Sequence, residues 1–379
     1  MSDSARNVLL LSKNFVPQVG GGVRRVHAIS QILPQHAYSV FSVASSGKPD
    51  LLYRSSSDRL RQLARQLKLG RIYRKAARWL SVPDEGVIDI PDLILRTRHT
   101  NPDLILASGP PNSILLAAQA LSKSLGCPWV ADLRDPWIDH PQNAPPSALH
   151  ASAQAYLENY CLQTASGVVV ATQAMADAIG NRIRSDIPVH TFFNGYNASQ
   201  LLDVSPQKKE QPTVGYFGSF YGPITPLPLV KAVAGANAVL IHAGADYDKQ
   251  LQQAADKHGV SVQSLGLLSP EQSFAQMHEV DILAMVLPDD PSWAYCRTQK
   301  LAEYLATRRP ILAFIPAGEA SELIKKHDAG ISVPHTDTKT AIEAIHTLSK
   351  RDVTNRKPPV DLSWESQIEK LARFLDQIS

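Results

Sequence analysis

Arg297, Lys300 and Glu303 recur at intervals of three residues. In a helix, residues three apart lie on adjacent turns, so these two cations and one carboxylate would share a face. Cations near a helix start can hold a diphosphate, and a carboxylate can accept two hydrogen bonds from a ribose diol. The trio therefore suits a sugar nucleotide. The alternative is a surface helix in which Lys300 and Glu303 pair only with each other.

The elements around this trio place it at the edge of a sheet. Leu301 and Leu305 recur at helical spacing, the helix is predicted to stop at Pro310, and the apolar run 311–315 follows as a strand. Such junctions lie where a parallel sheet opens its ligand crevice. We therefore predict that the helix over 296–310 faces a ligand.

Three consecutive glycines, Gly20, Gly21 and Gly22, follow a predicted buried strand at 8–12 and precede a helical pattern. Glycines let the backbone approach a phosphate or sugar, and a helix N-terminus adds partial positive charge. A merely tight turn has the same pattern. An NAD site is disfavoured, because Arg25 stands where a dinucleotide fingerprint needs its third glycine and no acid ends the next predicted strand.

A second polar cluster, Asp132, Arg134, Asp135 and Trp137, ends the predicted strand that begins at 128. The carboxyl ends of strands in an open parallel sheet face the crevice, so we predict that these side chains contact ligand. The alternative is a buried structural pair that fixes the loop. Unpaired burial of three charges would be costly, which favours the functional interpretation.

The segment 54–78 contains nine Lys and Arg residues against the single acid Asp58, with an apolar stripe from Leu60 to Leu67. This pattern predicts a basic amphipathic helix that lies on anionic lipid. A helix packed on its own domain has the same pattern. The cations expected to contact a membrane are Arg59, Arg61, Arg65, Lys68 and Arg71.

Composition bounds the class of protein. A chain of 379 residues with 44% hydrophobic residues can bury two cores, and its net charge of +3 gives no case for a nucleic-acid partner. Cys127, Cys161 and Cys296 lack metal-ligand spacing, which indicates free thiols in a reducing compartment. The start of the chain has no signal h-region and no run approaches the length of a membrane span. We expect a cytoplasmic protein, with any membrane contact peripheral on the inner face of the cytoplasmic membrane.

Strands and helices alternate along the chain, and the polar segment 203–212 separates two such series. The predicted class is α/β, with two Rossmann-like parallel-sheet domains facing a cleft. We expect an N-terminal domain over 1–203, a C-terminal domain over 212–362, and a final helix over 363–379 that crosses back to the first domain.

In their order along the chain, the motifs resemble the GT-B superfamily of nucleotide-sugar glycosyltransferases, specifically its large retaining family four. The resemblance covers most of the chain. Its pieces are Phe15-Val16-Pro17 with 20–25, 102–105, 132–137, Asn194-Gly195-Tyr196, 215–219, and 300–306 with Arg309-Pro310.

The resemblance implies that the N-terminal domain binds the acceptor and the C-terminal domain binds the donor. Glu303 would engage the donor ribose, and Lys300 and Arg297 would hold the diphosphate beside the turn at Gly218 and Ser219. The loop Gly20 to Gly22 would close over the phosphates. Arg24, Asp132 and Trp137 are the expected acceptor contacts.

Several positions depart from the family pattern. Tyr295 stands where a second glutamate often contacts the donor sugar, and residues 218–228 contain no cation where the family usually has two. Arg134 or Asp135 occupies the place of a histidine near the acceptor, so both are catalytic candidates, with Asp135 as the hypothetical base. In a retaining transfer the leaving diphosphate can itself help to deprotonate the acceptor, and stabilising its charge is then the main catalytic task.

No cofactor or metal is expected. Asp246 with Asp248, and Asp289 with Asp290, are acidic pairs of a kind common in loops, and GT-B enzymes usually bind the diphosphate without a divalent ion.

These observations predict a glycosyltransferase that moves a sugar from a nucleoside-diphosphate sugar to a glycan acceptor. The basic segment favours a lipid-linked acceptor, as in bacterial-type surface polysaccharide or glycoconjugate synthesis, and the resemblance favours retention. The alternatives are a GT-B nucleotide-sugar isomerase and a non-catalytic carbohydrate-binding or scaffold subunit. A dehydrogenase is the least favoured class.

Overall fold

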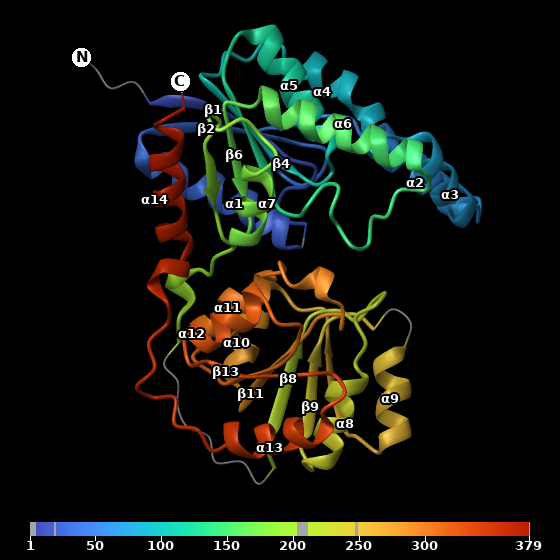
Figure 1. The fold of residues 1–379 in the computed structure, drawn as a ribbon, viewed down its shortest axis with the longest axis vertical. Coiled ribbons are helices and arrows are strands. Elements are labelled where there is room, and N and C mark those ends of the chain that lie inside the picture. Colours follow the sequence, from blue (N-terminus) through green and yellow to red (C-terminus); the bar gives the residue numbers. More distant parts are fainter. Residues whose placement is uncertain (1–4, 19, 203–210, 247–248, 379) are drawn as a thin grey trace. The chain divides into compact units, whose positions relative to one another are not determined.

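The computed structural model describes residues 5–18, 20–202, 211–246 and 249–378, and the chain forms two compact units (Figure 1). Unit 1 comprises Met1–Phe193 and Glu365–Ser379, and unit 2 comprises Asn194–Trp364. Most of the predicted linker at 203–212 lies outside the described residues.

Unit 1 is built on a parallel sheet whose order in the described residues is β3-β2-β1-β4-β5-β6-β7. Its inner strands are almost continuously apolar and buried, as expected for a sheet covered on both faces. The strands are β1 (Arg6–Leu11), β2 (Tyr38–Ala44), β3 (Leu51–Leu52), β4 (Leu104–Gly109), β5 (Trp129–Leu133), β6 (Gly167–Val170) and β7 (Val189–Thr191).

The helices of unit 1 follow these strands, and the last helix of the chain joins them. They are α1 (Gly21–Ile32), α2 (Ser56–Gln66), α3 (Gly70–Leu80), α4 (Ile90–Thr97), α5 (Ser113–Leu125), α6 (Ala148–Thr164), α7 (Gln173–Gly180) and α14 (Trp364–Leu375).

Hydrogen bonds to the first two strands hold the end of the chain on unit 1. The Arg6 guanidinium donates to the carbonyls of Leu375 and Ile378, each at 2.7 Å. The Tyr38 hydroxyl donates to Asp376 Oδ1 at 2.6 Å. Residues separated by more than 330 positions in the sequence thus form one compact unit.

Unit 2 has a second parallel sheet, with the order β10-β9-β8-β11-β12-β13 in the described residues. Its strands are β8 (Thr213–Phe217), β9 (Val239–Ala243), β10 (Val262–Gly266), β11 (Ile282–Val286), β12 (Ile311–Phe314) and β13 (Gly330–Val333). Its helices are α8 (Leu227–Gly235), α9 (Gln250–His258), α10 (Pro270–His278), α11 (Gln299–Thr307), α12 (Glu319–Lys326) and α13 (Thr338–Leu348). The predicted class, α/β with two Rossmann-like parallel-sheet domains, is confirmed.

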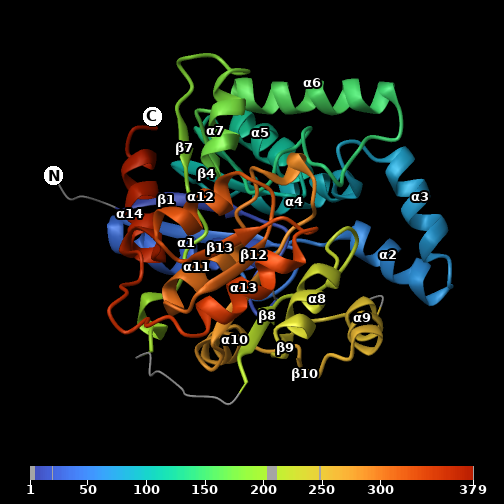
Figure 2. The same ribbon diagram turned by 60° about the horizontal axis from the view of Figure 1, so that its bottom comes forward.

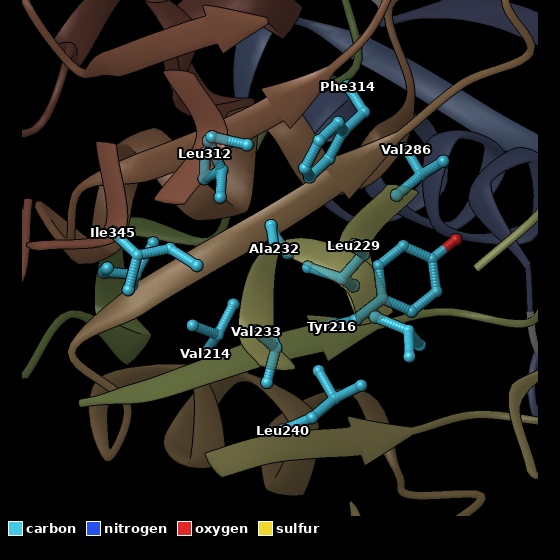
Figure 3. Close-up of a cluster of buried hydrophobic side chains, with 14 of the residues drawn as sticks. Val214, Tyr216, Leu229, Ala232, Val233, Leu240, Val286, Leu312, Phe314 and Ile345 are labelled. Atoms are coloured by element: carbon cyan, nitrogen blue, oxygen red, sulfur yellow. The ribbon is translucent and has the colours of Figure 1, made fainter. Parts of the chain in front are cut away.

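A cluster of buried side chains forms the core between this sheet and two of its helices (Figure 3). Leu229 and Val233 of α8 and Ile345 of α13 pack against Leu240 of β9 and Leu312 of β12, and none of these five side chains is exposed to solvent. This core fixes the strands whose carboxyl ends carry the predicted donor-binding residues.

The structure corrects the predicted helix over 296–310. Thr298 is extended and is the N-cap, so the helix α11 begins at Gln299 and Arg297 precedes it. Arg297 therefore does not share a helical face with Lys300 and Glu303.

The predicted single helix over 54–78 is also wrong, because it is the two helices α2 and α3. The chain turns between them at Lys68, whose φ of 58° is in the left-handed region that ends a helix.

Candidate active site

The turn after β8 lies at the carboxyl edge of the unit 2 sheet, and its backbone conformation restricts which residues can occupy it. The Gly218 N–H donates to the Ala243 carbonyl at 2.8 Å, and His242 Nε2 lies 2.9 Å from the Gly218 carbonyl oxygen. A Cβ on Gly244 would overlap that same carbonyl. The turn therefore runs tightly beside the end of β9. Both glycines have positive φ, and at Gly244 the neighbouring backbone also leaves no space for a side chain.

A lysine from α11 reaches this turn. The Tyr304 hydroxyl accepts a hydrogen bond from the Phe217 N–H at 3.1 Å, which fixes α11 against the end of β8. One helical turn earlier, Lys300 Nζ lies 4.2 Å from the centroid of the Tyr216 ring. A Cβ added to Gly218 would lie 2.5 Å from that nitrogen. The site thus brings together Gly218 and Lys300, as the sequence predicted.

The surroundings of Lys300 leave its charge available to a ligand. Burial lowers the pKa of Lys300 to about 8, and among the described residues no carboxylate forms an ion pair with it. At neutral pH the amine is still protonated, and a half-buried cation that is paired only with an aromatic face favours an anionic ligand. The N-terminus of α11 lies beside it and adds partial positive charge, with the Thr298 hydroxyl oxygen buried and without a partner among the described residues.

The other predicted donor contacts, Arg297, Ser219 and Glu303, differ from Lys300 in their burial and bonding partners. Arg297 is 10% exposed, with its guanidinium 4.0 Å from Glu319 at the start of α12. Burial lowers the pKa of Arg297, and the charges of Glu319 and Asp361 act against that shift. Ser219 Oγ accepts from the Ala245 N–H at 3.1 Å, so it also braces the turn. Glu303 is half-buried on α11, one turn beyond Lys300.

In unit 1 the charge cluster after β5 contains a structural ion pair, which corrects the prediction for Asp132. Asp132 is 0% exposed, and Arg25 Nε donates to its Oδ2 at 3.0 Å while a second guanidinium nitrogen contacts Oδ1. Ser108 donates to Oδ2 at 2.7 Å, and Arg25 also donates to the Phe192 carbonyl. Because both carboxylate oxygens are bonded inside the core, Asp132 is not an acceptor contact in this structure.

Trp137 is the second correction. Its side chain is 4% exposed and its Nε1 donates to Gln154 Oε1 of α6 at 2.6 Å. It packs inside unit 1 and presents no face to an acceptor.

Arg134 holds two loops of unit 1 together. Its Nε donates to the Gly109 carbonyl at 2.9 Å, and a terminal guanidinium nitrogen donates to the Pro110 carbonyl. A Cβ on Gly22 would overlap the other terminal nitrogen, so the glycine loop lies directly on this guanidinium. Burial lowers the pKa of Arg134, while Asp132 and Asp135 oppose that shift. Arg134 is therefore a positioning residue for the loop that includes Gly22.

Three further predicted residues surround that loop. Gly20 is the N-cap of α1 with a φ of 151°, and Gly21 is the first residue of the helix. Arg24 is half-buried in the first turn, and Asp135 is half-buried just after Arg134. The structure brings Gly22 and Arg134 together, and it leaves the roles of Arg24 and Asp135 as predictions.

The sequence analysis missed the aromatic residues that position Lys300. Tyr216 and Phe220 stack with ring centroids 4.2 Å apart, and His242 lies 6.0 Å from Tyr216. Burial lowers the pKa of His242, which favours its neutral form beside the Gly218 carbonyl. The spacing of Lys300 and Tyr304, four residues apart on one helix, was the signal that could have suggested a shared contact.

The sequence contains two acidic pairs that could suggest a metal site, and in each pair a carboxylate accepts hydrogen bonds from nearby backbone N–H groups. Asp246 Oδ2 accepts from two N–H groups at the start of α9, and Asp290 Oδ1 accepts from the Ser292 N–H. Asp248 lies outside the described residues. Within the described ranges, no three His, Cys, Asp or Glu side chains cluster as metal ligands would. No helix in those ranges has both the length and the apolar character of a bilayer span.

Comparisons with known proteins match one family model over part of the chain and one fold over nearly all of it. Residues 20–195 match the family model described as a glycosyl transferase 4-like domain. No curated protein matches the sequence. Three solved structures resemble the whole chain and cover 98% of it: sucrose-phosphate synthase from Thermosynechococcus elongatus (13% identity, TM-score 0.70, 98% of that chain), Anabaena HepE in complex with UDP-glucose (18%, 0.67, 99%), and WaaG, a glycosyltransferase of lipopolysaccharide biosynthesis (12%, 0.64, 95%).

The structural assignment of Asp132 makes a prediction about stability. Asp132→Ala leaves the Arg25 guanidinium buried without its counter-charge, so the free energy of unfolding should fall by about 3–5 kcal/mol. Urea denaturation of the purified protein measures the change. Asp135→Ala, a loss of the same charge from a half-buried neighbour, is the matched control and should cost much less. Equal stability of the Asp132→Ala variant and the wild type would contradict the assignment.

Proposed function

We propose that this chain, which has the GT-B fold and whose residues 20–195 match the model of a glycosyl transferase 4-like domain, is a glycosyltransferase that moves a sugar from a nucleoside-diphosphate sugar to a glycan acceptor. The resemblance deduced from the sequence motifs is confirmed at the level of the fold, and the family match over 20–195 supports the proposed enzyme class. The donor, the acceptor and the stereochemistry belong to the proposal.

The observation that carries the proposal is the placement of Lys300 against the glycine turn of β8. A diphosphate needs positive charge at close range, and Lys300 supplies it at this turn, beside the N-terminus of α11. A side chain at Gly218 would fill the space next to the ammonium. We assign the donor diphosphate to this place.

Other donor contacts follow from the same helix. Glu303 lies one turn beyond Lys300 and has the carboxylate that a ribose diol requires. Ser219 is in the turn itself, and its hydroxyl hydrogen is not used by the bond that it accepts from Ala245. Arg297 supports the phosphate site indirectly, through its ion pair at the start of α12. No metal or cofactor is required in this proposal, because Lys300 and the helix N-terminus supply the positive charge.

For the chemical step we propose retention. The bond between the anomeric carbon and the diphosphate oxygen breaks, the acceptor oxygen bonds to that carbon from the same face, and the leaving diphosphate takes the acceptor proton while Lys300 stabilises its charge. In unit 1, Arg134 supports the loop that includes Gly20, Gly21 and Gly22. Asp135 is the alternative candidate for the group that takes the acceptor proton. Arg24 is the candidate for an acceptor contact.

The proposed acceptor is a lipid-linked glycan, and the proposed location is the cytoplasmic face of a membrane. The basic helices α2 and α3 support this proposal, because polybasic segments are attracted to anionic lipid by about 1 kcal/mol per residue. Among the structurally similar proteins, WaaG is involved in lipopolysaccharide biosynthesis, and HepE was solved in complex with UDP-glucose. A bacterial-type surface glycoconjugate is thus the proposed product.

Two other functions are compared with the proposed glycosyltransferase: a non-catalytic carbohydrate-binding subunit and a nucleotide-sugar isomerase. Tyr295 and the absence of cations over 218–228 favour a non-catalytic carbohydrate-binding subunit with a weakened donor site. A nucleotide-sugar isomerase would use the same donor site without an acceptor.

Donor binding tests the role of Lys300. A screen of UDP-, GDP- and dTDP-sugars by thermal shift identifies the ligand, since binding to the native state alone raises its stability. Lys300→Met should then weaken that ligand about 10- to 100-fold by calorimetry, which is the loss expected for one charge-assisted hydrogen bond. Lys257→Met, on α9 of the same unit, removes an equal charge and should leave affinity unchanged. Equal affinity of the wild type and the Lys300→Met variant would contradict the assignment.

The lowered pKa of Lys300 predicts a pH profile. The diphosphate binds the ammonium form, so donor affinity should be constant below about pH 8 and should fall as pH rises above that value. Titration calorimetry between pH 6.5 and 9.5 measures the profile. The Lys300→Met variant should lose the decline, and a decline that persists in this variant would assign it to another group.

Turnover separates the transferase from its alternatives. Donor incubated with glycan acceptors should release nucleoside diphosphate only when an acceptor is present. Conversion of the donor without any acceptor would indicate the isomerase, and donor binding without either product would indicate the non-catalytic subunit. Phosphate-31 resonance spectra distinguish the three results.

A further inference from the structure

The helices α2 and α3 differ from an ordinary surface helix, because most of their large apolar side chains are exposed to solvent and are not buried against unit 1. The residues of α2 that are buried are Ser57 and Ala64, and α3 has no buried residue. Large apolar side chains point to solvent instead: Leu60 (47% exposed), Leu63 (50%), Leu67 (59%), Leu69 (46%), Ile72 (66%), Trp79 (49%) and Leu80 (84%). We call the surface of these seven residues the hairpin face. Figure 2 shows α2 and α3 at the edge of unit 1.

Polar contacts hold the inner side of this hairpin. Lys13, just after β1, donates to Ser55 Oγ at 2.7 Å and pairs with Asp58 at 2.9 Å. Ser57 donates through its hydroxyl to Asp89 at 2.6 Å, and the Tyr73 hydroxyl donates to Glu85 at 3.0 Å. Because the helices are attached through these groups, the hydrophobic stripe that the sequence shows is not used for the core of unit 1.

The far end of the hairpin is attached to α6. His150 Nε2 lies 2.9 Å from the Trp79 carbonyl oxygen, and the two rings meet edge to face at 5.4 Å. Arg78 donates to the Ala144 carbonyl at 2.8 Å. Leu149, which precedes His150 on α6, is 78% exposed.

Cations surround the exposed apolar residues. Residues 56–80 contain eight Lys and Arg and one carboxylate, a net charge of +7, so the rest of the chain, whose total is +3, carries −4. One predicted contact is corrected, because Arg61 pairs with Glu85 and Asp58. The remaining seven cations of 56–80 form no ion pair with a carboxylate among the described residues. They are Arg59, Arg65, Lys68, Arg71, Arg74, Lys75 and Arg78.

Aliphatic and tryptophan side chains interleaved with unpaired cations match the boundary of an anionic bilayer. There the apolar groups enter the acyl region and the cations meet lipid phosphates. We propose that the hairpin face docks unit 1 on an anionic membrane by inserting Leu67, Ile72 and Leu80, with the surrounding Lys and Arg residues in the headgroup layer. The proposal deepens the lipid-linked acceptor of the proposed function, and it adds insertion to the attraction of charges.

Vesicle flotation tests the insertion with the full chain and no substrate. The wild type should float with vesicles of phosphatidylcholine and phosphatidylglycerol and not with phosphatidylcholine alone. The triple variant Leu67→Ser, Ile72→Ser, Leu80→Ser keeps every charge and should reduce the bound fraction at least tenfold. Leu267→Ser changes an 81% exposed leucine of unit 2 and should bind as the wild type does.

Each result decides the proposal. Undiminished binding of the triple variant would overturn insertion and leave a purely electrostatic attachment. No binding of the wild type to anionic vesicles would overturn membrane docking and assign the hairpin face to a protein partner. Nucleoside-diphosphate binding, measured on the same samples, should be equal in all variants, so failure of the donor-site proposal is distinguishable from failure of this one.

Discussion

The geometry of the proposed donor site in unit 2 depends on a buried hydrogen bond from the Phe217 N–H to the Tyr304 hydroxyl. It fixes α11 against the end of β8, and Lys300, one turn earlier on the same helix face, is thereby placed at Gly218. Burial of Tyr304 makes this bond hard to exchange for one with water, since a buried N–H without a partner would be costly. A helix that slid by one residue would lose both contacts together.

The charged residues of unit 1 follow a different constraint. An ion pair in the core is tolerated only when its remaining hydrogen-bonding positions are also filled, and Arg25 and Asp132 meet that condition through Ser108 and the Phe192 carbonyl. Arg134 uses its guanidinium on two carbonyls and lies under Gly22. These side chains therefore stabilise the carboxyl edge of the unit 1 sheet, and a substrate would have to contact more exposed residues.

Much of the fold could be predicted from sequence because buried parallel strands are nearly continuous apolar runs and helices between them have caps. Ser269 and Gln272, for example, form a capping box at the start of α10, and the Asp337 side chain caps α13 by accepting from the Thr340 N–H. The helix α6 was missed, since its apolar residues show no one-sided pattern. Residue type and spacing singled out Gly218 and Lys300, which the structure brings together, and their role in binding stays a proposal. Asp132 and Trp137 were misassigned, because the partners that bury them, Arg25 and Gln154, are distant in the sequence.

The central claim is that unit 2 binds a nucleoside diphosphate at the turn after β8. A crystal structure of the protein with the nucleoside diphosphate selected by the binding screen tests it most directly. We expect phosphate oxygens within hydrogen-bonding distance of Lys300 Nζ and beside the N-terminus of α11, with the ribose hydroxyls at Glu303. Electron density for the diphosphate at another place, with Lys300 still in contact with the Tyr216 ring, would contradict the proposed binding site.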